Sequence, residues 1–252
     1  MKNFLKEPPP TDLHGRLKFT TENFVAVSDV RDKTILNIGC GYGWFELWAL
    51  KNGVRRITGI EMTDADLETA RAFVKDPRAV FQIGSALDAG VPNESCDTVV
   101  SWEVIEHIPR QTESKMFSEA HRVLRPGGIF YLSTPNKHWL SILLDPTYWM
   151  IDHRHYSIEF LKKLGAGNGL QLSRHEIRAG WLEAFDLWNL YVAKWIFRRQ
   201  RFFKSGSLAM SDASYRGPGF NTLFAKFQKI SQDGEKQFAA SLAEPEPVEM
   251  TG

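Results

Sequence analysis

The chain has 252 residues, long enough to bury the core of an α/β domain. Its 31 basic and 30 acidic side chains leave a formal net charge of +1, so no global field favours nucleic acid. Two cysteines, Cys40 and Cys96, are too few for a disulfide framework or a cysteine zinc site, as is typical of a reducing compartment. No window reaches the ~18 apolar residues of a spanning helix, and residues 1–15 lack the apolar core of a secretory signal. These features predict a soluble, cytoplasmic protein.

Strand-like and helix-like patterns alternate through the first half of the chain. The strand-like runs are residues 34–38, 56–60, 79–84, 97–102 and 129–135. The helix-like runs are residues 44–53, 64–75 and 112–124, and the RPGG segment is expected to end the last of them. This alternation predicts β-α-β crossovers and a parallel sheet with helices on both faces. Ligands of such sheets bind beyond the carboxyl ends of the strands.

The second half of the chain has a different pattern. Residues 136–156 are aromatic and irregular, and residues 157–169 predict a helix that Ser157 caps. The expected strands that follow are residues 170–178 and 219–230. Between these strands, residues 181–203 predict a helix with a broad aromatic face. Packing on the sheet, a cap over a lipophilic substrate, a homodimer interface and peripheral membrane contact all remain open for this face.

These patterns divide the chain into three segments. We expect an N-terminal lead-in and helix, a catalytic domain with an inserted lid, and a polar, proline-bearing tail that is disordered. The corresponding ranges are residues 1–29, residues 30–230 with the lid at about residues 181–218, and residues 231–252.

Three glycines at alternate positions, Gly39, Gly41 and Gly43, end the first strand. Glycine permits positive φ and close approach of a ligand, and the next helix points its amide dipoles into the turn. A dinucleotide fingerprint needs another glycine where Trp44 stands. Glu61 ends the second strand about 20 residues further on, where a carboxylate can accept hydrogen bonds from ribose hydroxyls. These residues predict a ligand that contains a ribose and does not require a phosphate.

Four segments in this order resemble class I S-adenosylmethionine-dependent methyltransferases. The resemblance is to the branch that includes quinone-biosynthesis and many small-molecule O-methyltransferases. The segments are ILNIGCGYG (35–43), ITGIEMTDADLETAR (57–71), FQIGSALDAGVPNESCDTVVSWEVIEHI (81–108) and RVLRPGGIFYLSTPN (122–136). The resemblance implies an α/β, Rossmann-like, seven-stranded and mostly parallel sheet with helices on both faces. It also implies a C-terminal antiparallel hairpin strand, an inserted helical lid, and S-adenosylmethionine as cofactor, which leaves as S-adenosylhomocysteine.

The resemblance assigns cofactor roles to ten residues. The turn surrounds the methionine part, the end of the second strand holds the ribose and packs on the adenine, and the ends of the third and fourth strands complete the site. In that order, the residues are Gly39, Cys40, Gly41 and Gly43; Glu61 and Met62; Ser85 and Ala86; Trp102 and Glu103. Ser85 stands where the family often has an Asp that meets the adenine amino group.

Several of these residues also have simpler interpretations. Cys40 is expected to be a small packed residue rather than a reactive thiol, and Met62 can be read as core filler. Glu103 and Glu106 share one helical face, a spacing that also fits solvated charges. We interpret Glu106 as such a surface charge and leave both readings open for Glu103.

Three histidines are candidates for contact with the methyl acceptor. An oxygen acceptor must lose a proton, and a histidine is suited to receive it near neutral pH. His107 is the first candidate base, although it can also merely brace its loop. His153 and His155 follow, since related enzymes often carry a histidine-rich stretch over the substrate site. They face the same way on an extended segment, but the sequence shows no third convergent ligand and therefore predicts no metal site.

The sequence thus predicts a methyltransferase that acts on a small or lipophilic metabolite. A hydroxyl oxygen of a quinol-type, glycan or glycolipid acceptor is the expected target. Nucleic acid is not an expected partner, because SWEVIEH stands where amino-methylating DNA enzymes have an Asn/Asp-Pro-Pro-aromatic run. The alternative is a non-catalytic binding module that acts through the aromatic surface of residues 181–203.

Overall fold

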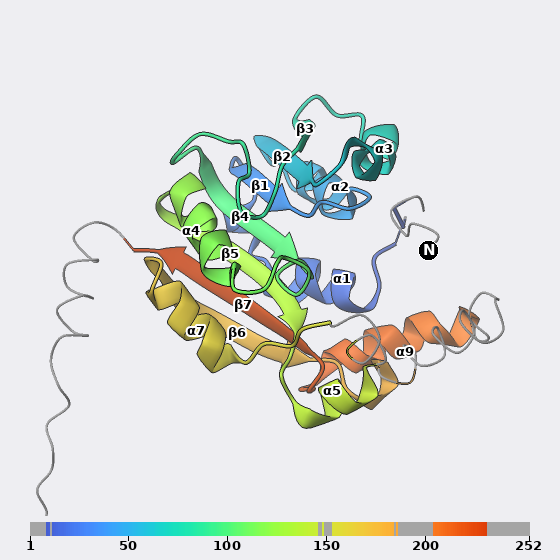
Figure 1. The fold of residues 1–252 in the computed structure, drawn as a ribbon. Coiled ribbons are helices and arrows are strands. Elements are labelled where there is room, and N and C mark those ends of the chain that lie inside the picture. The colour runs from blue at the N-terminus through green and yellow to red at the C-terminus, as the bar shows by residue number, and fades with distance from the viewer. Residues whose placement is uncertain are drawn as a thin grey trace, which may run out of the picture.

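Seven strands form one sheet in the computed structural model, which describes residues 9–10, 12–145, 148, 153–183, 185 and 204–230. The strand order is β3-β2-β1-β4-β5-β7-β6 (Figure 1). The strands are β1 (Thr34–Ile38), β2 (Arg56–Glu61), β3 (Ala79–Ile83), β4 (Cys96–Trp102), β5 (Leu124–Pro135), β6 (Leu170–Arg178) and β7 (Thr222–Lys229). The first five pair in parallel, and β7 runs antiparallel to both β5 and β6. The predicted Rossmann-like sheet with its antiparallel C-terminal strand is confirmed.

Helices cover both faces of the sheet (Figure 1). The bounds are α1 (Gly15–Phe19), α2 (Trp44–Lys51), α3 (Asp64–Phe73), α4 (Glu113–Val123), α5 (Trp139–Leu144), α7 (Ile158–Ala166) and α9 (Lys204–Arg216). One apolar cluster packs Phe117 of α4 and Leu161 of α7 against the sheet. The other packs Phe45 of α2 and Tyr215 of α9 against the opposite face. Burial of these two apolar layers is the main term that stabilises such a fold.

Local signals explain where several helices begin. Thr63 caps α3 by accepting a hydrogen bond from the Asp66 N–H, and Ser157 caps α7 by accepting one from Phe160. The expectation that RPGG ends the helix is confirmed, since α4 ends at Val123, but β5 already begins at Leu124 rather than at residue 129. The pairing of β4 with β5 shifts register at this point, so the strand absorbs the extra residues as an irregularity.

Two further differences from the expectations lie in the second half of the chain. Residues 136–156 contain α5, and α9 precedes β7. The predicted aromatic helix at residues 181–203 and the tail at residues 231–252 fall almost entirely outside the described residues. Among the described residues, no helix combines the length and the apolar character needed to cross a bilayer.

The segment before β1 is part of the core. The Phe19 ring centroid lies 4.9 Å from that of Phe224, and the Phe24 ring meets Tyr131 edge-on at 5.6 Å. Each aromatic ring removes a large apolar area from water. The expected lead-in is therefore packed against β5 and β7 from α1 onward.

Glu46 of α2 is a buried carboxylate next to the central strand β1. Its Oε1 accepts a hydrogen bond of 2.8 Å from Asn37 Nδ2, while its Oε2 is buried with no partner among the described residues. Burial raises the pKa of Glu46 to about 7, an effect that the Asn37 bond opposes. The folded state therefore favours the protonated form of this side chain.

The raised pKa predicts that Glu46 makes the protein less stable as the pH rises. Between the unfolded pKa near 4.5 and the folded pKa near 7, the native state holds a proton that the unfolded state has lost. Above pH 7, this difference in proton binding lowers the free energy of unfolding by roughly 3 kcal/mol. Glu46→Gln should therefore unfold at a higher temperature than wild type at pH 8, with a gap that closes toward pH 5. A gap that is equal at pH 5 and pH 8 would contradict the assignment.

Candidate active site

The turn between β1 and α2 has the backbone conformation that its glycines predict. Gly39, Gly41 and Gly43 have φ of 74°, 56° and 85°, in the left-handed region. A Cβ on Gly39 would lie 2.4 Å from Val104 Cγ2. The Gly39 and Cys40 N–H groups, which precede the helix, both donate to the carbonyl of Ile60. The turn is therefore fixed against the end of β2 and exposes a bare backbone at the carboxyl edge of the sheet.

Glu61 lies beside this turn at the end of β2. Its Oε1 accepts a hydrogen bond of 2.7 Å from the Gly41 N–H, which orients the carboxylate across the turn. Burial raises the pKa of Glu61, while this bond opposes the shift. Cys40 is buried, and burial together with the charges of Glu46 and Glu61 raises the pKa of its thiol. This favours the packing role expected for Cys40 over a reactive thiolate.

The residues after β2 and β3 frame an accessible apolar surface. Met62 is 67% exposed and Ile83 is 58% exposed, so Met62 is not core filler. Ser85 accepts a hydrogen bond from the Leu87 N–H through Oγ, and Ala86 is buried. The exposed thioether of Met62, next to the Glu61 carboxylate, is suited to packing on a flat aromatic base.

Trp102 and Glu103, the two residues predicted for the cofactor site at the end of β4, have different environments. Trp102 is buried against Phe45, with ring centroids 5.6 Å apart, and its Nε1 has no hydrogen-bond partner among the described residues. Glu103 has a φ of 57°, which is strained for a residue with a side chain. Its carboxylate accepts a 2.6 Å hydrogen bond from Ser133 Oγ and pairs with Arg16 at 2.8 Å. Glu103 is thus a held, partly buried group, and its partner Arg16 comes from the N-terminal helix α1.

Glu106 is not the solvated charge that its spacing suggests. It is 3% exposed, and its Oε2 accepts a hydrogen bond of 3.1 Å from Thr134 Oγ1. Burial raises its pKa to about 7. The turn after β4 directs this side chain inward, toward β5, which the sequence spacing alone does not reveal.

His107 and His153 lie next to each other beside Glu106. Their ring centroids are 5.2 Å apart, and His153 Nε2 lies 3.9 Å from Glu106 Oε1. His107 is exposed, whereas His153 is half-buried. Desolvation lowers the pKa of His107 to about 4, helped by the nearby charges of His153 and Arg154. The His107 ring is therefore neutral at pH 7.

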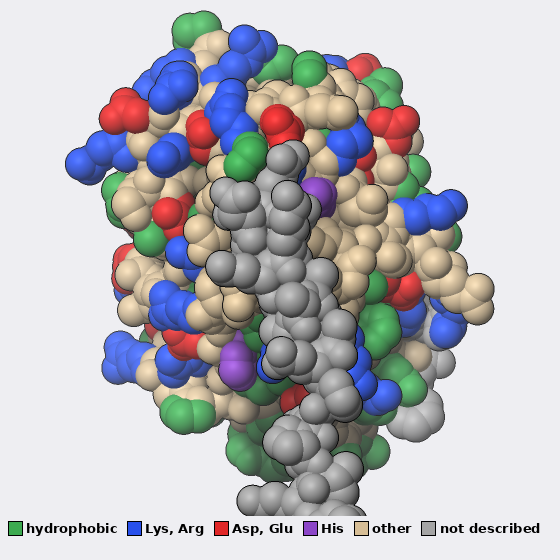
Figure 2. All heavy atoms as spheres, turned by 90° about the vertical axis from the view of Figure 1, so that its left-hand side faces the viewer, with side chains coloured by type: hydrophobic (Ala, Val, Ile, Leu, Met, Phe, Trp, Pro, Cys, Tyr) green, Lys and Arg blue, Asp and Glu red, His purple; other side chains and the backbone are tan. Residues whose placement is uncertain are grey.

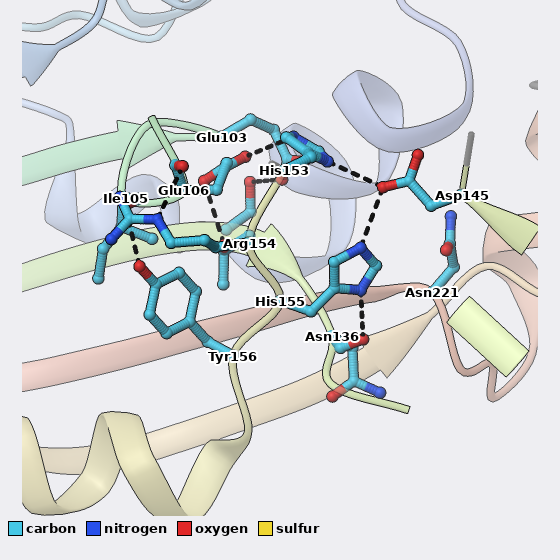
Figure 3. Close-up of polar contacts among 12 residues, drawn as sticks. Glu103, Ile105, Glu106, Asn136, Asp145, His153, Arg154, His155, Tyr156 and Asn221 are labelled. Carbon is cyan, nitrogen blue, oxygen red and sulfur yellow. Dashed lines mark hydrogen bonds and ion pairs between the residues drawn. The ribbon is translucent and has the colours of Figure 1, made fainter. Parts of the chain in front are cut away.

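His155 has a different environment from the other two histidines. Its side chain is buried, Nε2 lies 3.0 Å from Asp145 Oδ2, and Nδ1 lies 3.0 Å from the Asn136 carbonyl oxygen (Figure 3). Asp145 Oδ2 is also 2.9 Å from His153 Nδ1. With both ring nitrogens in hydrogen bonds, His155 is arranged to brace the segment, which favours its structural reading.

Arg154 ties the loop after β4 to the histidine segment, a role absent from the sequence analysis. Its guanidinium donates to the carbonyls of Ile105 and Glu106 (Figure 3). It also donates to the carbonyl of Ile108 and pairs with the carboxylate of Glu113. The hydroxyl of Tyr156 donates to the same Ile105 carbonyl at 3.2 Å. In the sequence, Arg154 is a lone arginine between two histidines. Its role could not be predicted from this position, because its partners lie more than 40 residues away along the chain.

The strand order, the bare turn at the carboxyl edge and the acidic residue that ends β2 define a class I methyltransferase fold. Residues 36–132 match the family described as a methyltransferase domain. This matched region covers less than half of the chain and is similar to S-adenosylmethionine-dependent methyltransferases. The [4+2]-cyclase SpnF is structurally similar, with a TM-score of 0.62, 17% identity and coverage of 91% of each chain. At this identity the likeness concerns the fold alone.

Two curated relatives are similar over the same region. A probable S-adenosylmethionine-dependent methyltransferase of Mycolicibacterium smegmatis is 36% identical over 105 residues, which are 42% of this chain and 39% of that protein. A ubiquinone biosynthesis O-methyltransferase of Hydrogenovibrio crunogenus is 32% identical over 118 residues, which are 46% of this chain and 48% of that protein. The chain therefore spans less than half the length of these two relatives.

The residues present fit S-adenosylmethionine. The turn offers a backbone without side chains, and a Cβ on Gly43 would collide with Val74 Cγ2 at 2.8 Å. Glu61 presents a carboxylate beside that backbone, and Met62 presents exposed apolar surface next to it. This donor set matches the amino acid, ribose and base of the cofactor in turn.

The bonds of Arg154 predict a large loss of stability when they are removed. Its side chain and that of Glu113 are each 13% exposed, so Arg154→Met removes the charged partner of a shielded carboxylate and one donor from each of three carbonyls. We expect a loss of roughly 3 kcal/mol in the free energy of unfolding, measured with urea. Arg71→Met is the matched control, since Arg71 pairs with Asp64 on the surface and should cost less than about 1 kcal/mol. Equal losses in the two variants would rule out this role for Arg154.

Proposed function

We propose that this protein transfers a methyl group from S-adenosylmethionine to a hydroxyl oxygen of a small or lipophilic metabolite. The observation that carries the proposal is the contact between the Gly41 N–H and Glu61, which combines a bare turn with a ribose-binding carboxylate. The cofactor supplies an activated methyl group on a positively charged sulfur. The chain has to bind it, align the acceptor with it and exclude water.

We assign the cofactor contacts as the resemblance implies. The turn residues hold the methionine part, Glu61 accepts hydrogen bonds from the ribose hydroxyls, and Met62 packs on the adenine. Ser85 and Ala86 border the base, and a serine oxygen can accept a hydrogen bond from the adenine amino group. Trp102 and Glu103 close the site on the side of the acceptor.

The acceptor lies by His107 in this proposal. His107 is exposed and only three residues from Val104, whose side chain abuts the glycine turn. The likeness to the O-methyltransferase of H. crunogenus supports an oxygen acceptor. The balanced charge supports a small molecule over nucleic acid, and Figure 2 shows acidic and basic side chains interspersed on one face.

A non-catalytic binding module is the alternative. The fold alone does not exclude it, since SpnF shows that a closely similar fold serves another reaction. A cap, a homodimer or membrane contact through residues 181–203 stays a prediction. Co-sedimentation with anionic vesicles at low salt tests the membrane contact, because electrostatic attraction is strongest there.

Glu61→Ala should abolish or strongly weaken binding of S-adenosylmethionine and S-adenosylhomocysteine, because the ribose hydroxyls lose their acceptor. Isothermal titration calorimetry measures this, with NAD as a ligand that should not bind. Glu68→Ala is the matched control, since Glu68 is an exposed acidic residue of the neighbouring α3. Absence of binding to folded wild-type protein would refute the proposed function, and binding unchanged in Glu61→Ala would refute the assignment of Glu61.

His107→Ala should lower kcat by about 10²-fold or more, the typical contribution of a group that assists proton removal from the acceptor. Binding of S-adenosylmethionine should be unchanged. The matched control is His175→Ala, which removes an exposed histidine of β6. Turnover within a few-fold of wild type at pH 6 to 9 would show that His107 does not assist proton removal from the acceptor.

A further inference from the structure

The carboxylate of Glu106 has one buried oxygen that no described residue satisfies. Thr134 donates to Oε2, but Oε1 has no hydrogen-bond partner among the described residues. An unpartnered buried carboxylate oxygen is costly. Figure 3 shows Glu106 facing His153, whose Nε2 lies 3.9 Å from Oε1, beyond hydrogen-bond distance. This separation leaves room for a third group between the two atoms.

In the neutral form of His153, the hydrogen on Nδ1 leaves a lone pair on Nε2. Nδ1 lies 2.9 Å from Asp145 Oδ2, and because an ionised carboxylate only accepts, Nδ1 carries the hydrogen. A carboxylate that holds the far nitrogen of a histidine is the usual outer-shell support of a metal ligand. The lone pair of Nε2 and the carboxylate oxygen of Glu106 thus face one another, an arrangement that a cation between them would stabilise.

His107 supplies a third ligand atom. The ligand atoms of Glu106, His107 and His153 all lie within 4.8 Å of one another. Two atoms that each lie about 2.0–2.2 Å from one ion are roughly 3–4 Å apart, so small side-chain movements complete the set. The sequence offered no third ligand for His153, and the fold brings two ligands from the loop after β4.

We propose that Glu106, His107 and His153 bind one divalent transition metal ion. Two imidazoles and one carboxylate suit zinc-class cations, whereas magnesium and calcium prefer sites made of oxygen. Three protein ligands leave a coordination position open, as in catalytic rather than structural zinc sites. The second cluster of Asp145, His153 and His155 serves as support, because its atoms already bond one another at 2.9 and 3.0 Å.

The place of this site gives the ion a role that rests on the proposed function. The backbone N–H of His107 donates to the Val104 carbonyl at 2.8 Å, and the Val104 side chain borders Gly39 of the cofactor turn. Glu106 is buried and His107 exposed, so the cluster opens to solvent on the His107 side. An acceptor hydroxyl at the open position would release its proton to solvent more readily, because a bound cation lowers the pKa of an oxygen ligand, and His107 would then assist proton removal as a ligand of the ion.

The test is metal binding by untagged protein that has been treated with a chelator and dialysed. Calorimetry with Zn²⁺ and Co²⁺ should give one ion per chain, and Mg²⁺ should bind at least tenfold more weakly. Glu106→Gln and His153→Asn keep the side-chain shapes and should each weaken Co²⁺ binding by roughly tenfold or more. The matched control His175→Asn should bind as wild type does.

Two results would overturn the proposal: wild type that binds neither Zn²⁺ nor Co²⁺, or affinity that is equal in wild type and both site variants. If a variant unfolds, the visible spectrum of wild type with Co²⁺ decides: bands of imidazole and carboxylate ligation support the site, and the spectrum of aqueous Co²⁺ refutes it. Titration of the same protein with S-adenosylmethionine tests the proposed function separately. Binding of S-adenosylmethionine without binding of metal would refute the metal site and leave the proposed function standing.

Discussion

The turn between β1 and α2 can exist only without side chains at its first and last glycines, and the rest of the site depends on this constraint. A Cβ at Gly39 would overlap Val104, and a Cβ at Gly43 would overlap Val74. Both positions also need positive φ. The loop after β4 and the end of α3 thus lie close against this backbone, and Glu61 at the end of β2 accepts a hydrogen bond from the Gly41 N–H within it. Because Gly39 and Gly43 have no Cβ, the turn can pack closely and a ligand can approach its backbone.

The loop after β4 needs more support than the turn, because it contains a strained residue and a buried charge. Glu103 keeps its positive φ while Ser133 and Arg16 hold its carboxylate. Arg154 binds three carbonyls further along the loop and links them to α4 through Glu113. The N-terminal helix and the histidine segment thus fix the same loop from two sides. A strained segment persists where its surroundings over-determine it.

The antiparallel final strand was expected from the family resemblance. Periodicity and glycine spacing were enough to predict the parallel strands and the turn at Gly39. These features come from local rules that act over a few residues. The contacts of Arg16 and Arg154, and the burial of Glu106, could not be predicted in this way. They join residues 28 to 87 positions apart, and a spacing of three residues fits a solvated face as well as an inward turn. The early start of β5 at Leu124 was also not predicted, and its pairing with β4 passes directly from Leu124 to Ile129.

Two buried carboxylates near the carboxyl edge of the sheet show how the surroundings decide what such a group can do. Both have one oxygen with a hydrogen bond and one without a partner among the described residues, and burial raises both pKa values to about 7. Glu46 of α2 faces β1 with an amide as partner, so a proton is what can neutralise it. Glu106 instead faces a histidine nitrogen and opens toward an exposed ring. The same desolvation that merely costs stability at Glu46 prepares Glu106 to hold the cation that we propose.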